Sequence, residues 1–184
     1  MSSFKESWKE HVDIPGLLLS LGVDLEEEGL EDTPRRVARA YEEFLHGYTL
    51  DAEEILERTF ESDNKGIVLC RNIEFTSLCE HHFVPFFGIC HIGYVPKDRV
   101  VGLSKLTRLV DCFAQRLQIQ ERLVQNICDA MVEHLEPTGV LVIAKAKHLC
   151  CLGRGVKRTK MDFVCTSQYG SIDSTLYHIL LGDE

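Results

Sequence analysis

Two short clusters of cysteine and histidine are the residues of this chain best suited to chemistry. The first is Cys79-Glu80-His81-His82, and the second, much later in the chain, is His148-Leu149-Cys150-Cys151. A thiolate and an imidazole three residues apart can turn toward one point, and zinc prefers these two kinds of ligand. Such spacings also arise by chance, so either cluster alone is weak evidence. Both lie at the ends of predicted strands, and together they indicate a metal site.

The number of available ligands predicts the kind of site. Cys79, His82 and one cysteine of the second cluster, Cys150 or Cys151, would give zinc three protein ligands and leave its fourth position open. This is the pattern of catalytic zinc, which lowers the pKa of bound water to about 7 and so provides a nucleophile at neutral pH.

Two histidines remain spare beside these ligands. His81 and His148 are candidate general acids and bases for a hydrolysis that needs several proton transfers. For either histidine considered alone, a hydrogen bond within the fold is an equally good interpretation.

Three basic residues predict a phosphate site. Lys105 and Arg108 lie on one face of the first turn of a predicted helix, where free backbone N–H groups favour an anion. Arg154 lies between two glycines just after the second cluster, and glycine permits close approach of the backbone. Solvated basic side chains are the alternative interpretation. The polar run Gln118–Arg122 is either an exposed break in the helix or an amide and a carboxylate that bind the edge of a base.

Hydrophobic periodicity predicts the elements that position these residues. We expect helices in the first third, with Thr33 as a cap and Gly47 as a stop, and a long helix from a cap at Ser104 to Pro137. The predicted arrangement is α+β with an antiparallel sheet. The other expected elements are an apolar helical stretch at Ile14–Gly22, a helix at Asp51–Phe60, and strands at Ile67–Ser77, Phe83–Val95, Val140–Ala146 and Phe163–Gln168.

Length and composition exclude several classes of protein. The chain has 184 residues, of which 45% are hydrophobic and 27% charged, so it has room for a real core and is not intrinsically disordered. The net charge of −9 argues against nucleic acid or anionic membrane as a partner. Residues 1–63 carry 17 acidic and 6 basic side chains, whereas residues 64–184 carry 12 and 14. We therefore expect an acidic helical region over 1–63 and a catalytic region over 64–184, acting as one functional domain.

The N-terminal residues do not resemble a signal peptide, and no apolar run is long enough to cross a bilayer. We expect a cytoplasmic protein. In a reducing compartment the eight cysteines are not expected to form a disulfide framework.

These residues together resemble the GTP cyclohydrolase I family. The similarity covers most of the chain, in ordered blocks whose chemistry matches. The blocks are Asp32–Ala38, Cys79–His82, Gly102–Leu106, Arg116–Leu123, His148–Cys150 and Arg154–Val156.

The resemblance implies a tunnelling-fold (T-fold) subunit with a pair of helices on one side of an antiparallel sheet. It implies a toroidal homodecamer of two stacked pentamers, with active sites between subunits. The implied reaction converts GTP and water to 7,8-dihydroneopterin triphosphate and formate, at the entry to tetrahydrofolate or tetrahydrobiopterin synthesis. Hydrolytic opening of the imidazole ring is followed by opening and rearrangement of the ribose.

Matching positions imply a role for each site residue. The implied zinc ligands are Cys79, His82 and Cys150. His81 would assist at the imidazole ring, His148 at the ribose and Ser104 in the rearrangement. Glu121, helped by Gln120, would hold the guanine edge, and Glu80 lies at a family position close to the site. The triphosphate would be bound by Lys105, Arg108 and Arg154, some of them from a neighbouring subunit.

Other interpretations predict different chemistry. A related T-fold nitrile reductase uses NADPH and a cysteine nucleophile, and it would not require the pairing of Cys79-x-x-His82 with His148-x-Cys150. A non-catalytic protein stabilised by zinc would need a fourth protein ligand and no spare histidines. The adjacent Cys151 is a departure from the family pattern, and a Cys79–Cys150 disulfide in a zinc-free form is a further possibility.

Overall fold

The computed structural model describes residues 12–63, 65–173 and 175–181. It divides into two compact units, Met1–Glu43 and Phe44–Glu184. In the first unit, α2 (Ile14–Ser20) begins after Asp13, whose side chain caps the helix by accepting from the Gly16 N–H. The helix α3 (Thr33–Phe44) ends before Gly47, as predicted. The predicted boundary at residue 63 follows charge and element type, and it stays a prediction.

The second unit contains the remaining elements. None of the described helices is long and apolar enough to cross a membrane. In chain order the elements are η1 (His46–Thr49), α4 (Ala52–Leu56), β1 (Thr59–Glu61), β2 (Val68–Cys79), β3 (Pro85–Val95), β4 (Arg99–Val101), α5 (Leu103–Ala114), β5 (Leu117–Gln118), α6 (Gln120–Leu135), β6 (Gly139–His148), α7 (Leu149–Leu152), β7 (Phe163–Gly170) and α8 (Thr175–Leu181).

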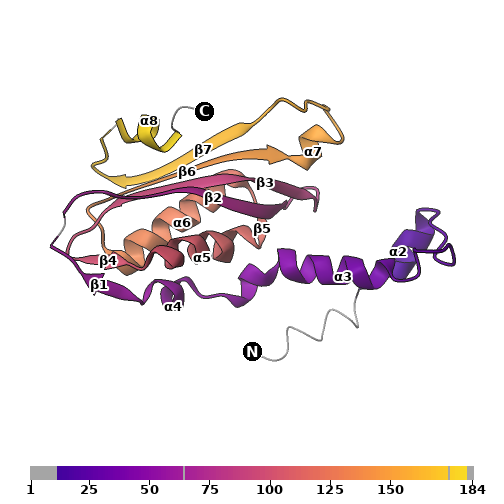
Figure 1. The fold of residues 1–184 in the computed structure, drawn as a ribbon. Helices are drawn as coiled ribbons and strands as arrows, with labels where there is room; N and C mark the ends of the chain where they lie inside the picture. Colours follow the sequence, from indigo (N-terminus) through magenta and orange to yellow (C-terminus); the bar gives the residue numbers. More distant parts are fainter. Residues whose placement is uncertain (1–11, 64, 174, 182–184) are drawn as a thin grey trace. The chain divides into compact units, whose positions relative to one another are not determined.

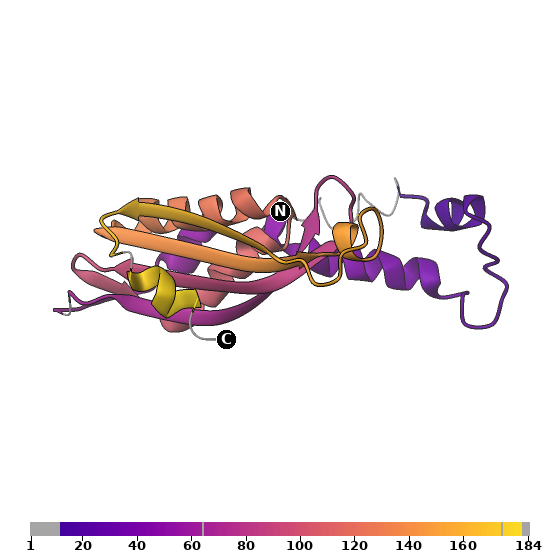
Figure 2. The same ribbon diagram turned by 90° about the horizontal axis from the view of Figure 1, so that it is seen from above.

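A curled five-stranded sheet forms the centre of this unit (Figures 1 and 2). Its strand order is β5-β2-β3-β6-β7, and every pair is antiparallel except the short parallel pair of β5 with β2. A separate two-stranded ribbon joins β1 to β4. All four predicted strands are present, and the antiparallel α+β prediction is confirmed.

Helices α5 and α6 cover one face of the sheet, and the short α8 lies against the other (Figure 1). Alternation along β6 explains both layers, because successive side chains point to opposite faces. Val140, Val142 and Ala144 belong to the main core on the α5–α6 side. Leu141 and Ile143 pack instead with Leu176 and Leu180 of α8.

The helix predicted for Asp51–Phe60 is wrong in its second half. The helix α4 ends at Leu56, and Thr59–Glu61 forms the strand β1. Its partner is Arg99–Val101, which supplies backbone hydrogen bonds from a distant part of the chain. Tertiary pairing of this kind overrides a local helical pattern.

The single long helix predicted from Ser104 is also wrong, because α5 and α6 are separate. The connection contains β5, which pairs with the end of β2 through Leu78–Leu117 and Cys79–Gln118. The apolar periodicity continues across the break because both helices bury a face against the same sheet. Gly102, and not Ser104, is the N-cap residue of α5.

Arg116 secures the turn between these two helices. Its guanidinium donates to the carbonyl oxygens of Cys112, Gly47 and Leu50, with N–O distances of 2.6, 3.2 and 3.4 Å. The Gly47 N–H in turn donates to the Gln115 carbonyl at 3.0 Å. These bonds tie η1 to the end of α5 and fix where the chain enters β5.

Candidate active site

The two Cys/His clusters meet at one edge of the sheet. Because β3 is antiparallel to both β2 and β6, those two strands run in the same direction and end at the same edge. Cys79 is the last residue of β2, and Cys150 follows β6 directly, in α7. Phe86 of β3 lies between them, paired in register with Ser77 on one side and His148 on the other.

A tight turn after β2 brings His82 back to Cys79. The Cys79 N–H donates to the Val84 carbonyl at 2.9 Å, and the Phe83 N–H donates to the Cys79 carbonyl at 2.8 Å. Phe83 has a φ of 56°, a left-handed conformation that is costly for a bulky residue and that reverses the chain here. As a result, the His82 Nδ1 lies 3.7 Å from the Cys79 Sγ.

Cys79, His82 and Cys150 offer three ligand atoms that all lie within 4.8 Å of one another. Both cysteines are buried, whereas His82 is exposed. No fourth residue in the described part of the chain belongs to this group. The structure therefore brings together the three predicted ligands, and it groups Cys150, and not Cys151, with the first cluster.

The environment of the two thiols fits a divalent cation. The pKa of the Cys150 thiol is raised to about 11, first by burial and then by its contacts with Cys151 and Cys79. Without a cation this thiol stays protonated at neutral pH. A bound cation stabilises the thiolates that burial and mutual repulsion disfavour, and a set of two sulfurs and one imidazole suits zinc.

The His148 ring packs against two phenylalanine rings beside the metal ligands. Its ring stacks on Phe86 with centroids 4.5 Å apart and an interplanar angle of 3°, and Phe163 meets it edge-on at 5.2 Å. Its Nε2 lies 2.9 Å from the Gln120 Oε1. Burial lowers the pKa of His148 below its usual value, and the Glu121 carboxylate offsets part of this shift.

His81, in contrast, points into solvent. Its side chain is 64% exposed, with Nδ1 3.9 Å from the Cys79 Sγ and Nε2 3.8 Å from the Glu80 carboxylate. Glu80 also forms an ion pair with Arg122 of α6. The sequence had not singled out Arg122, although it belongs to the polar run that was noted as a possible binding segment.

The start of α6 lies beside the ligands because β5 pairs with Cys79. The Glu80 N–H donates to the Gln118 carbonyl at 3.1 Å, which secures this approach. Gln120 is only 2% exposed, and its amide nitrogen donates to the carbonyls of Ala144 and Phe163. Glu121 is exposed and free to face a ligand.

The first turn of α5 is far from the metal ligands within one chain. Val101 precedes it, and the Val101 N–H donates to the Tyr94 hydroxyl at 3.1 Å, near the opposite end of β3 from Phe86. The helix is about 18 Å long, and only its far end approaches the site. A single chain therefore does not bring Ser104, Lys105 and Arg108 to the metal group.

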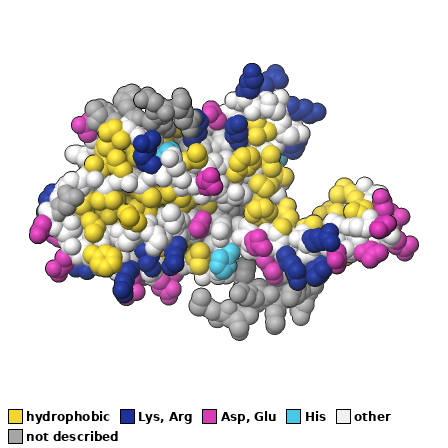
Figure 3. Space-filling view, viewed as in Figure 1, with side chains coloured by type: hydrophobic (Ala, Val, Ile, Leu, Met, Phe, Trp, Pro, Cys, Tyr) yellow, Lys and Arg dark blue, Asp and Glu magenta, His cyan; other side chains and the backbone are white. Residues whose placement is uncertain are grey.

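Arg154 lies closer, in the exposed loop that follows α7. Figure 3 shows Lys and Arg side chains gathered over this loop, which also contains Lys157, Arg158 and Lys160. This loop is therefore positively charged, although the chain as a whole is acidic.

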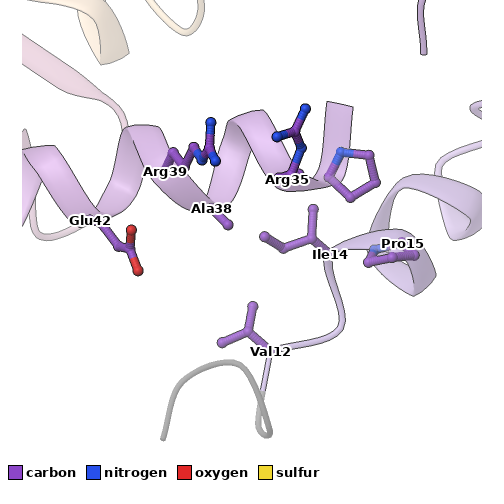
Figure 4. A pocket seen from close by; sticks show the side chains of 8 residues that line it. Val12, Ile14, Pro15, Arg35, Ala38, Arg39 and Glu42 are labelled. Atoms are coloured by element: carbon purple, nitrogen blue, oxygen red, sulfur yellow. The ribbon is translucent and has the colours of Figure 1, made fainter. Parts of the chain in front are cut away.

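A separate pocket of 410 Å³ lies within the first unit (Figure 4). None of the predicted site residues lines it. The lining residues are Val12, Ile14, Pro15, Pro34, Arg35, Ala38, Arg39 and Glu42.

Comparisons with known proteins point to one family. The family model described as GTP cyclohydrolase I matches residues 11–177. GTP cyclohydrolase 1 of Halalkalibacterium halodurans is 50% identical over 156 residues, covering 84% of this chain and 83% of that protein. The protein of the same name from Thermobifida fusca is 45% identical over 157 residues, covering 84% and 76%, and that from Clostridium perfringens is 43% identical over 166 residues, covering 90% and 89%.

A solved structure is similar in fold. The apo crystal structure of the archaeosine synthase QueF-Like matches with a TM-score of 0.50 at 14% identity, over 61% of this chain and 100% of that one. This match supports the T-fold and nothing beyond the fold. The match to the family model and the similarity to curated relatives over most of their length show that this chain belongs to the GTP cyclohydrolase I family.

Proposed function

We propose that this chain converts GTP and water to 7,8-dihydroneopterin triphosphate and formate at a zinc site held by Cys79, His82 and Cys150. The observation that carries the proposal is the close grouping of these three ligand atoms, in a chain of the GTP cyclohydrolase I family. A three-ligand site leaves one coordination position for water or substrate.

Zinc in this position would supply Lewis acidity and lower the pKa of a water molecule. The exposed His81 can give or take protons at the imidazole ring of guanine, because it can exchange protons with solvent. Its Nδ1 also lies 3.9 Å from the Sγ of the ligand Cys79, so it is close to the metal position. His148 is the second acid–base group, and its lowered pKa keeps it neutral near pH 7. It would act at the ribose.

Substrate binding requires both an acceptor and cations. The exposed Glu121 carboxylate can accept from the guanine N1–H and 2-amino groups, which point the same way. The Glu80–Arg122 ion pair limits movement of the loop that carries His81. Arg154 is suited to one end of the triphosphate.

A second copy of the chain would complete the site. Lys105 and Arg108, with Ser104, lie at the far end of α5 from the metal ligands of their own chain. Their proposed contact with triphosphate therefore needs a neighbouring subunit. We infer a homodecamer of two pentamers with active sites between subunits.

We also propose that the protein acts in the cytoplasm. All eight cysteines are free, which suits a reducing compartment.

The two other functions fit less well. A non-catalytic zinc site calls for a fourth protein ligand, and the described group has three. An NADPH-dependent nitrile reductase does not call for a Cys-His-Cys group, and the T-fold similarity at 14% identity does not favour that chemistry.

The direct test is to incubate the zinc-loaded protein with GTP. We expect release of formate and, after oxidation and dephosphorylation, fluorescent neopterin. A parallel reaction with NADPH and a nitrile substrate should show no oxidation of NADPH. Absence of neopterin from the zinc-loaded protein would overturn the proposed function.

A further inference from the structure

Both the nitrogen and the oxygen of the Gln120 amide make hydrogen bonds inside the chain. Its Nε2 donates to the carbonyl oxygens of Ala144 at 2.8 Å and Phe163 at 2.9 Å. Carbonyl oxygens only accept hydrogen bonds, so the NH₂ group of the amide must face them, and both of its hydrogens are used. The atom 2.9 Å from the His148 Nε2 is therefore the amide oxygen, Oε1.

The orientation of this amide determines the tautomer of His148. Oε1 carries no hydrogen, so the hydrogen in the contact must lie on the imidazole Nε2. In the neutral ring, Nδ1 is then the nitrogen with a free lone pair. Within the described part of the chain, no residue forms a hydrogen bond to that Nδ1.

The ring is also prevented from turning over. Phe86 stacks parallel to it and Phe163 closes the edge, so a turn about the Cβ–Cγ bond, which would put Cε1 in the place of Nε2, would have to displace an aromatic neighbour. Gln120 is equally constrained, because it is 2% exposed and lies at the first residue of α6. The two side chains form one rigid unit.

We propose that Gln120 is a positioning residue that holds His148 in the Nε2–H tautomer and leaves Nδ1 as the atom that accepts a proton from the substrate. This role rests on the proposed function, in which His148 serves the ribose chemistry. It also replaces the expected contact of the Gln120 side chain with guanine, because the amide is only 2% exposed, both of its N–H groups donate to carbonyls and its oxygen faces His148.

The tautomer can be measured directly in the wild-type protein. We would label the full-length, zinc-loaded protein with ¹⁵N-histidine and record solid-state NMR spectra, assigning His148 by the signals lost in His148→Asn. We expect a protonated Nε2 and an unprotonated Nδ1. A signal from the Nδ1–H tautomer would overturn the proposal. This measurement does not depend on turnover or on the folding of a Gln120 variant.

Kinetics separate positioning from base recognition. Gln120→Met keeps the length of the side chain but cannot accept from His148, so we expect kcat to fall by at least about 100-fold with KM for GTP unchanged. Gln120→Glu restores an acceptor oxygen but turns its second oxygen toward the Ala144 and Phe163 carbonyls, so at most part of kcat should return. The preference for GTP over ITP, which lacks the 2-amino group, should be unchanged in both variants.

Glu121→Gln is the matched control, since it alters the neighbouring residue that faces the base. We expect this variant to lose preference for GTP over ITP. If Gln120→Met loses that preference in the same way, or keeps the wild-type kcat, the positioning role is wrong. A wild-type protein that forms no neopterin would overturn the proposed function instead, while the NMR result would still decide the tautomer.

Discussion

Cys150 and Cys151 are neighbours in sequence but differ in their surroundings. The Cys150 Sγ is within 4.8 Å of the ligand atoms of Cys79 and His82, whereas Cys151 is only partly buried and contacts the Cys150 Sγ at 3.9 Å. Family resemblance and geometry therefore select the same cysteine. Sequence spacing alone had left both open, because α7 determines which thiol turns toward Cys79.

We predict that Cys150→Ser loses bound zinc and GTP turnover, because a hydroxyl is a much poorer zinc ligand than a thiolate. Metal content by mass spectrometry and neopterin formation are the two measurements. Cys151→Ser is the matched control and should keep both. If Cys150→Ser retains zinc while Cys151→Ser loses it, the ligand assignment is reversed.

Metal removal should also lower stability. A ligand that binds only the folded state at 100 times its Kd stabilises it by about 2.7 kcal/mol, and the site joins two elements distant in sequence, β2 and α7. We expect a chelator to lower the Tm of the wild-type protein, as measured by scanning calorimetry. The Cys150→Ser variant should show no such shift, and an equal shift in both proteins would place the stabilising metal elsewhere.

At the scale of elements, the strands could be predicted, whereas a break between the helices was only one of two interpretations of the polar run Gln118–Arg122. Val, Ile, Phe and Cys in partial alternation mark β2 and β3, the buried-type run Val140–Ala146 marks β6, and Phe163–Gln168 falls within β7. Leu106, Leu109, Leu123 and Ile127 are all buried against one core, so their period passes through the break without interruption. Only the pairing of β5 with Cys79, a contact between distant segments, separates α5 from α6.

The same limit applies to the site. The ligand clusters are local in sequence and were visible as motifs. The stacking of His148 on Phe86 depends on the register between β3 and β6, and the Glu80–Arg122 ion pair depends on β5. Neither has a local signal, so the sequence could name the candidate site residues but not the contacts that hold them.

We predict that Arg116→Met destabilises the turn into β5. The substitution removes donors from the carbonyls of Gly47, Leu50 and Cys112. The first two keep the Leu50 N–H and the Cys112 S–H, but the Cys112 carbonyl loses its partner at 2.6 Å, and an unsatisfied buried carbonyl costs about 1–3 kcal/mol. Urea denaturation should show the loss of stability. Arg158→Met, in an exposed loop, is the control and should unfold as the wild type does. A wild-type midpoint for Arg116→Met would show that these bonds do not secure the turn.

Gly88 allows β3 to approach β6 closely, and we predict that Gly88→Ala separates them. A Cβ at this position would lie 2.0 Å from the Lys145 carbonyl oxygen, and a clash with backbone cannot be relieved by a side-chain rotation. Overpacking of this kind costs about 1–3 kcal/mol.

The same shift would disturb the neighbouring Phe86–His148 stack, so thermal stability and kcat should fall together. Gly153→Ala is the control, because its Cβ would meet only the Leu149 carbonyl at 3.6 Å. Unchanged Tm in Gly88→Ala would contradict the close approach.

At the scale of the whole molecule, net charge describes the site poorly. The value of −9 is the sum of an acidic N-terminal region, residues 1–63, and of residues 64–184, in which basic side chains outnumber acidic ones. Lys105 and Arg108 lie in the first half of α5, whereas Arg154 lies in the loop that follows α7 and the ligand Cys150. In the proposed function, one chain therefore carries two halves of a triphosphate site that its own fold keeps apart, and assembly would join them.

This separation predicts complementation between inactive subunits. Cys150→Ser would disable the metal half of each site and Arg108→Ala the phosphate half, so either variant alone should have little activity. When the two are denatured, mixed in equal amounts and refolded with zinc, random assembly should restore about a quarter of the sites, because each half is intact in one subunit of two. Neopterin formation measures the recovery, and mixing without denaturation is the control. If the co-refolded mixture stays inactive while refolded wild type is active, both halves must come from the same chain, and the shared site is wrong.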